Sequence, residues 1–301
     1  MNPDALFGGI EGGGTKFICL VGRGPGDIQA EIQFPTTTPE ETLLKALEFF
    51  TPYAGQLAAI GLAPFGPLNL DPDSPTYGQI TATPKPGWTG TDVLAPFRAL
   101  FGIPLSLDLD VNAAAFGEYT WVPENRGLDS LIYFTIGTGI GAGIIANGQL
   151  VHGLTHPEAG HVHLPHDRES DPFDGICRFH GDCFEGLASG LAITSRWGQP
   201  ADALSDNHPA WELEAGYIAQ ALANIILTIS PQRIVLGGGV MKRGKLFPLV
   251  RSRVRELLNG YISSPVVTGS MQAYIVPPGL GESSGVLGAL ALAQKIHGGV
   301  T

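Results

Sequence analysis

The sequence predicts an α/β fold with two sheets, divided between two lobes. Apolar strand-like runs alternate along the chain with amphipathic helical patterns, which is typical of α/β proteins. Two apolar strands joined by a glycine-rich turn occur twice, in residues 7–22 and 130–150, which suggests an internal duplication. With 301 residues, 44% of them hydrophobic, the chain is long enough to bury two cores.

The first half of the chain follows this pattern in order. Residues 7–22 predict two strands with a tight glycine turn between them. Residues 39–54 predict a helix, because an acidic first turn precedes leucines at helical spacing. A buried strand is expected within 57–70, followed by a proline-rich and glycine-rich loop over 80–88 and a second helix near 93–101.

A short segment then leads into the second half. Apolar and polar residues alternate from Leu105 through Asp110, which predicts a strand with Asp108 and Asp110 on one face and a helix from Ala113. The remaining expected elements are a strand-turn-strand unit over 130–150, a helix over 215–229, a strand over 233–241, a helix over 246–258 and a closely packed Gly- and Ala-rich helix within 278–294.

Composition excludes several classes of protein. A net charge of −11 argues against nucleic-acid and anionic-membrane partners, which require clustered Lys and Arg. The sequence shows neither a signal-peptide pattern nor a long apolar run, so we expect a cytoplasmic protein. Of the three cysteines, Cys19 lies in an apolar strand and the other two share one loop, so a disulfide framework is not expected.

Segment 158–189 has the ligand spacing of a zinc site. Its four soft or borderline ligands are His161, Cys177, His180 and Cys183. Four protein ligands would close a tetrahedral shell, so the metal would be structural and a zinc hydrolase is disfavoured. His163 and His166 are competing ligands, and a histidine-rich solvated loop without metal is the alternative interpretation.

Three glycine-rich turns are candidate phosphate-binding sites. They lie at residues 12–14, 137–143 and 237–239, each beside an apolar strand. Without a Cβ atom, such turns let backbone N–H groups approach an anion closely. None of the three matches a P-loop or a complete dinucleotide fingerprint, and a single glycine turn of this kind is usually just a turn.

Acidic residues supply the remaining candidates. Asp110, where a strand gives way to a helix, could accept the proton of a hydroxyl that attacks a phosphoryl group. It could equally cap the helix that begins near Asn112. Glu158 and Glu185 could accept hydrogen bonds from sugar hydroxyls, although two solvated carboxylates are the simpler interpretation.

Taken together, these motifs resemble those of a known family. The chain contains, in order, GGIEGGGTKF, FGPLNL, TYGQITATPKPGW, DLDVNAAAFGE, FTIGTGIGAGII, HPEAGH, CRFHGDCFEGLASG, VLGGGVM and GLGESSGVLGAL. This series resembles the ROK family of sugar kinases (repressor, open reading frame, kinase), and within it the zinc-containing bacterial fructokinases.

The resemblance implies an actin-like (ribonuclease H-like) fold with duplicated mixed sheets and an active-site cleft between two lobes. Residues 1–117 with about 288–301 would form the small lobe, and 118–287 the large lobe. Asp110 would be the general base. ATP would bind at Gly12, Gly13, Gly14, Thr15, Lys16, Thr138, Gly139, Gly237, Gly238 and Gly239. The sugar would contact Gly66, Asn112, Glu158, His161 and Glu185. Zn²⁺ would bind His161, Cys177, His180 and Cys183.

Three positions depart from the common family pattern. Leu109 stands where most members carry an Asn that binds the sugar, and an apolar side chain cannot make that bond. Glu11 replaces a common Asp, and the Cys177 and His180 pair replaces Cys-x-Cys. The last two changes fit the fructokinase subgroup.

The expected reaction is transfer of the γ-phosphoryl group of MgATP to D-fructose, giving fructose 6-phosphate. Alternatives are a glucokinase or mannokinase of broad specificity, or a sugar-sensing transcriptional regulator. The regulator is disfavoured because the first phosphate motif begins by residue 11, before a DNA-binding domain could fit, and because the chain is acidic. The family resemblance also suggests a homodimer.

Overall fold

The computed structural model describes residues 5–298, which fall into two compact units. The first contains residues up to Arg126, the segment His152–His156 and residues from Ser283 onward. The second contains Gly127–Val151 and Pro157–Glu282. No helix of the described residues is long and apolar enough to cross a membrane.

The sheet of the first unit begins with the predicted glycine-turn hairpin. Its strands are β1 (Leu6–Gly12), β2 (Lys16–Gly24), β3 (Asp27–Pro35), β4 (Leu57–Pro64) and β5 (Leu105–Leu107). They lie in the order β3-β2-β1-β4-β5. The first three are antiparallel neighbours, whereas β4 and β5 run parallel to β1. The hairpin predicted over 7–22 is therefore confirmed.

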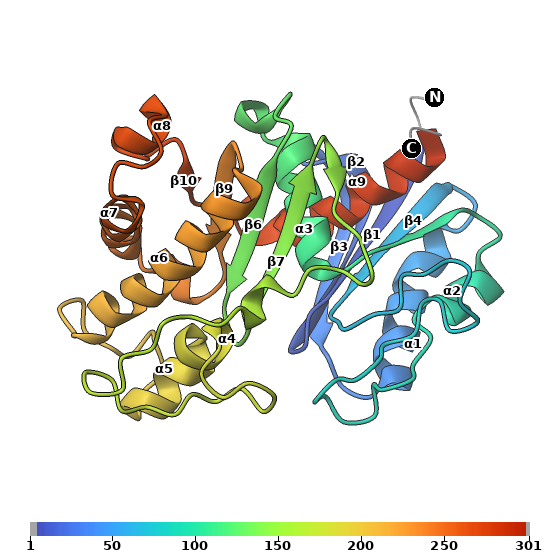
Figure 1. Cartoon of the computed structure of the whole chain (residues 1–301). Coiled ribbons are helices and arrows are strands. Elements are labelled where there is room, and N and C mark those ends of the chain that lie inside the picture. The colour runs from blue at the N-terminus through green and yellow to red at the C-terminus, as the bar shows by residue number, and fades with distance from the viewer. Residues whose placement is uncertain (1–4, 299–301) are drawn as a thin grey trace. The chain divides into compact units, whose positions relative to one another are not determined.

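Helices cover both faces of this sheet (Figure 1). A Cβ atom on Gly8 would lie 2.8 Å from Phe50 of α1 (Pro39–Phe50). One on Gly9 would lie 2.7 Å from the backbone oxygen of Val286 in α9 (Ser284–Gly298). Because successive strand residues point to opposite faces, α1 and α9 cover opposite sides.

Glycines also let two helices of the first unit approach closely. Helix α3 (Asp110–Trp121) packs against α9, and a Cβ atom on Gly117 would lie 2.6 Å from the Ser284 oxygen. A Cβ atom on Gly288 would overlap the carbonyl group of Ala113. The close packing predicted for the Gly- and Ala-rich C-terminal helix is confirmed.

Replacing Gly288 with alanine should destabilise the protein by about 1–3 kcal/mol or more, because the new methyl group meets rigid backbone. Thermal unfolding measures the loss. Gly216 provides the matched control, since it also lies inside a helix but has no atom within 4 Å of an added Cβ. Gly216→Ala should be neutral or stabilise by up to about 1 kcal/mol. Equal losses in the two variants would contradict the packing argument.

The sheet of the second unit repeats the topology of the first. Its strands are β6 (Leu131–Ile136), β7 (Ile140–Ala146), β8 (Gln149–Leu150), β9 (Arg233–Gly237) and β10 (Ile275–Val276). Read from β8, the order is β8-β7-β6-β9-β10. The first three are again antiparallel neighbours, followed by two strands parallel to β6. The duplication suggested by the two glycine-turn hairpins thus extends to whole sheets.

Helical predictions agree with the structure to within a few residues. Helix α7 spans Leu246–Leu258, as predicted, and α6 (Ala210–Ile229) begins five residues before 215. Helix α1 continues as a 3-10 turn to Tyr53. The other helices are α2 (Ala95–Leu100), α4 (Phe184–Ala188), α5 (Gly190–Trp197) and α8 (Pro265–Thr268), with 3-10 turns at Pro123–Asn125, Ala159–His161, Val240–Lys242 and Gly281–Ser283.

The strand predicted to run through Asp110 is wrong. Strand β5 ends at Leu107 and α3 begins at Asp110, so Asp108 and Asp110 do not share a strand face. The buried Asp108 carboxylate accepts hydrogen bonds from the Leu109 backbone N–H at 2.8 Å and the Asn112 amide at 2.6 Å. This local bonding starts the helix three residues before Ala113 and overrides the alternating pattern.

Candidate active site and metal centre

The four predicted metal ligands meet in the second unit. The ligand atoms of His161, Cys177, His180 and Cys183 all lie within 4.8 Å of one another. His161 Nδ1 is 3.7 Å from the Cys177 sulfur and 3.5 Å from the Cys183 sulfur. The Cys177 sulfur is also 3.6 Å from His180 Nδ1.

These separations fit a tetrahedral metal ion. Zinc binds sulfur at about 2.3 Å and nitrogen at about 2.0 Å, so tetrahedral angles place the two ligand atoms about 3.5 Å apart. The observed sulfur-to-nitrogen distances are 3.5–3.7 Å. Burial raises the pKa of the Cys183 thiol to about 11 in the absence of metal. The donor set and its geometry therefore suit Zn²⁺.

Backbone hydrogen bonds shape the ligand loop. Cys177 and Gly181 exchange N–H to carbonyl bonds of 3.1 and 2.8 Å, which closes the hairpin carrying Cys177 and His180. Gly181 turns the chain with a φ of +63°, a conformation that favours glycine. The hairpin closure expected from the Cys-x-x-His spacing is thus present.

The two competing histidines lie outside this cluster. His163 pairs with Cys183 in an isolated bridge, and its ring faces His180 at a centroid distance of 5.7 Å. His166 Nδ1 lies 3.0 Å from Asp182, and its Nε2 lies 2.9 Å from the Asp171 backbone oxygen. The geometry therefore favours His180 over either competitor as the fourth ligand.

Two of the predicted sugar-binding residues lie close together beside the metal ligands. His161 directs Nδ1 toward the sulfur atoms, while its Nε2 lies 3.9 Å from Glu185 Oε1. Glu185 Oε2 accepts the Ile140 backbone N–H at 2.9 Å, directly after the second glycine turn. Glu158 is exposed, and its backbone oxygen accepts the His161 N–H at 2.9 Å. The metal loop thereby connects Glu185 and His161 to the turn at 137–139.

The second and third glycine turns are neighbours in the second unit. Gly190, at the start of α5, donates its N–H to the Gly137 oxygen at 2.6 Å. A Cβ atom on Gly137 would lie 3.7 Å from the Gly239 nitrogen. Thr138 and Gly239 are exposed. The first turn, with Thr15 exposed, belongs to the other unit.

The first glycine turn has a basic neighbour that sequence reasoning missed. Lys85 donates from Nζ to the Gly14 oxygen at 2.6 Å, whereas the predicted Lys16 donates to Gln33 at 3.2 Å. Lys85 lies in the proline-rich and glycine-rich loop over 80–88, whose sequence does not indicate a contact with the first glycine turn. Only the folded chain brings the two segments together, so the sequence carried no signal for this contact.

The catalytic candidate Asp110 is half-buried in the first turn of α3. Its Oδ1 accepts the Val111 N–H at 2.8 Å, while Leu109 occupies the N-cap position. Asn112 is fully buried. Leu109 is also buried, and a Cβ atom on Gly66 would lie 2.6 Å from Leu109 Cδ2. Leu109 is therefore a core residue that fills space against Gly66.

Glu11 is a partly buried carboxylate one residue before the end of β1. Burial raises its pKa to about 7, although the Lys16 charge and the Val286 backbone hydrogen bond partly offset this effect. Since the folded-state pKa exceeds the unfolded value of 4.5, folding takes up a proton between these pH values. The stabilisation is complete below about pH 4.5 and is lost as pH rises through about 7.

We expect Glu11→Gln to reduce the loss of stability between pH 5 and pH 8. The rise in the Glu11 pKa from 4.5 to about 7 corresponds to a free energy of about 3 kcal/mol. Thermal unfolding across that pH range, compared with the exposed Glu31→Gln on β3 of the same sheet, measures the effect. An unchanged pH slope in Glu11→Gln would contradict this origin of the slope.

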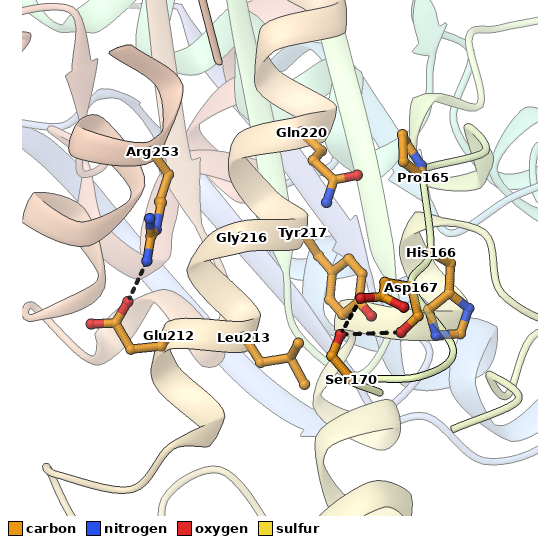
Figure 2. Close-up of a pocket in the computed structure, with 10 residues that line it drawn as sticks. All are labelled: Pro165, His166, Asp167, Ser170, Glu212, Leu213, Gly216, Tyr217, Gln220 and Arg253. Atoms are coloured by element: carbon orange, nitrogen blue, oxygen red, sulfur yellow. Dashed lines mark hydrogen bonds and ion pairs between the residues drawn. The ribbon is translucent and has the colours of Figure 1, made fainter. Parts of the chain in front are cut away.

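A pocket of about 510 Å³ lies next to the segment that carries the metal ligands (Figure 2). His166, Tyr217 and Arg253 are among its lining residues. Tyr217 donates to Asp171 at 2.6 Å, and Arg196 also binds Asp171. Ion pairs and hydrogen bonds to Asp171 thus connect the pocket residue Tyr217 to the loop before Cys177.

Two mixed sheets of one topology, each with a glycine turn in its leading hairpin, define an α/β fold of the actin-like ATPase class. The sequence matches the ROK family over residues 7–296, so the chain belongs to this family.

Named relatives are similar over nearly the whole chain. A provisionally named fructokinase of Bacillus subtilis is 48% identical over 290 residues, which cover 96% of each protein. A fructokinase of Zymomonas mobilis is 44% identical, with 97% of each protein covered. The ROK hexokinase structure from Thermus thermophilus has a TM-score of 0.76 at 26% identity and covers 96% of this chain and 98% of that one.

Proposed function

We propose that this protein is an ATP-dependent fructokinase that converts D-fructose to fructose 6-phosphate. The observation that carries the proposal is identity of 40–48% to proteins named as fructokinases, over 96–97% of this chain. The candidate residues for base, phosphate, sugar and metal binding that the resemblance implied are all present in the sequence.

In the proposed reaction, Asp110 accepts the proton of the 6-hydroxyl group as that oxygen attacks the γ-phosphorus of ATP. The bond from the γ-phosphorus to the bridging oxygen breaks, and ADP leaves. The glycine turns at 12–14 and 137–139 would donate backbone N–H groups to the phosphates, and the turn at 237–239 would border the adenosine. Mg²⁺, when bound with ATP, neutralises the charge of the phosphate oxygens.

The proposed sugar contacts come from Gly66, Asn112, Glu158, His161 and Glu185. The placement of Glu185 and His161 is compatible with a shared ligand, since their side chains lie together beside the second glycine turn. Carboxylate oxygens can accept hydrogen bonds from sugar hydroxyls. Asn112 would require its fully buried amide to become accessible, so it is better suited to holding the start of α3.

His161, Cys177, His180 and Cys183 would hold a structural Zn²⁺. Four protein ligands leave no position for a metal-bound water, so the proposed role is to fix the loop that carries His161 and Glu185. A homodimer and a cytoplasmic location complete the proposal. The location is supported by the chemistry of the loop, because metal-binding thiols must stay reduced.

The deciding experiment measures kcat/KM for fructose, mannose and glucose, each at saturating ATP. We expect fructose to be preferred. A larger kcat/KM for glucose or mannose would replace this proposal with the glucokinase or mannokinase alternative. Absence of phosphorylation of all three sugars would contradict a hexose kinase altogether.

A further inference from the structure

The segment His152–His156, here named the strap, leaves the second unit and packs within the first. Residues on either side, Gly127–Val151 and Pro157–Glu282, belong to the second unit. After the strap the chain continues within a few residues to Glu158 and His161. The strap is therefore a covalent link between the first unit and the segment proposed to bind sugar and metal.

His152 attaches the beginning of the strap to Asp108. Its Nε2 lies 3.0 Å from Asp108 Oδ2 and 3.2 Å from Oδ1. Because a carboxylate only accepts hydrogen bonds, His152 Nε2 must carry the hydrogen. The Asp108 side chain is 5% exposed, whereas that of His152 is 42% exposed. A partly exposed side chain thus holds a buried carboxylate.

Asp108 in turn fixes the start of the helix that bears Asp110. The same Oδ1 accepts the Leu109 N–H at 2.8 Å and the Asn112 amide at 2.6 Å. Asp110 lies between these two partners, in the first turn of α3. The orientation of the Asp108 carboxylate therefore determines where that turn begins and how Asp110 is presented.

The other end of the strap is attached as well. His156 is buried, and its Nε2 accepts the Leu68 backbone N–H at 3.4 Å. Leu68 lies two residues after Gly66. The two strap histidines thus hold the two segments of the first unit that contain the candidate residues Asp110 and Gly66.

We propose that His152 is a positioning residue for phosphoryl transfer. It acts through Asp108 on Asp110 and does not itself touch the substrate. This inference depends on the proposed role of Asp110. Because the Leu109 and Asn112 bonds to Asp108 remain when His152 is removed, the fold should survive while the geometry of Asp110 loosens.

The test compares His152→Ala and His152→Gln with the unmodified protein, using the sugar that the unmodified protein phosphorylates best. We expect His152→Ala to lower kcat between about tenfold and a hundredfold, because small misplacements of a reacting group have effects of this size. KM for ATP should change less than about twofold. His152→Gln, whose amide can still donate to Asp108, should recover most of the lost rate.

His208→Ala is the matched control, since His208 is a part-buried histidine that packs on Trp197 of the second unit. It should retain the full kcat. A double variant with Asp108→Asn adds a second test, because removing His152 should matter less once the carboxylate has gone.

Two results would overturn the inference. One is a kcat for His152→Ala within about twofold of the unmodified protein. The other is equal loss in the Ala and Gln variants, which would indicate a purely structural effect. If the unmodified protein phosphorylates no hexose, the proposed function itself fails. In that case, the backbone amide chemical shifts of Asp108 and Asp110 provide an independent test. If these shifts are the same in His152→Ala as in the unmodified protein, the positioning role is overturned.

Discussion

Asp110→Asn should lower kcat for fructose phosphorylation by about 10²- to 10⁴-fold, because an amide cannot take up the proton of the attacking hydroxyl group. The asparagine keeps an oxygen that can accept the Val111 N–H, now 2.8 Å from Asp110 Oδ1. The start of α3 should therefore persist, at a cost of about 0.3–1 kcal/mol from the lost charge. Steady-state kinetics and calorimetric titration with fructose separate the lost rate from the retained binding.

Asp92 supplies the control for this experiment. Its Oδ1 accepts the N–H groups of Leu94 and Ala95 at 2.9 and 3.0 Å, at the start of α2. Asp92→Asn therefore makes the same change at a helix start that has no proposed part in catalysis. It should leave kcat unchanged. An Asp110→Asn protein that turns over at the unmodified rate would eliminate Asp110 as the general base.

Removing the proposed structural zinc ion is expected to weaken fructose binding and to lower the thermal stability, while ATP binding persists. The free energy of metal binding contributes to the folding of the loop, so the loop should lose its ordered structure when the metal is removed. Glu185 and His161 would then lose the positions in which their side chains lie 3.9 Å apart. Metal content by mass spectrometry, followed by fructose and ATP titrations of the zinc-free protein, measures the effect.

Two exposed histidines provide a matched pair for the same question. His180→Ala removes a proposed ligand, whereas His163→Ala removes a neighbouring ring that lies outside the cluster. We expect His180→Ala to reduce zinc affinity by at least about a hundredfold, more than loss of a supporting residue outside the ligand shell. His163→Ala should keep one zinc per chain. Undiminished fructose affinity in a verified zinc-free protein would contradict the structural role of the metal.

The features predicted well from the sequence are those with local causes. The hairpins over 7–22 and 130–150, α7 and the clustering of the four Cys and His side chains in segment 158–189 each carry their pattern within a short stretch. The failed strand through Asp110 shows the limit of such patterns. Alternation favoured a strand, but the Asp108 side chain bonded to the backbone and to Asn112, which began a helix instead.

Features that depend on contacts between distant segments were not predictable. Lys85 meets Gly14, and His152 meets Asp108, across 71 and 44 positions of sequence. Neither residue lies in a pattern that marks its partner. Similarly, the sequence indicates only that Leu109 cannot bond to the sugar. The structure shows that Leu109 fills the core beside Gly66.

The position of α9 has a consequence for synthesis of the chain. This helix packs on β1, β2, β4 and β5 of the first unit, although β1 leaves the ribosome first and α9 last. Until α9 emerges, one side of that sheet, including Gly9 and Gly61, lacks its covering helix. The second unit contains nearly all its own elements between Gly127 and Glu282 and can close earlier. The first unit to be translated is therefore the last to be completed, and during that interval its uncovered sheet is the part of the nascent chain most exposed to aggregation.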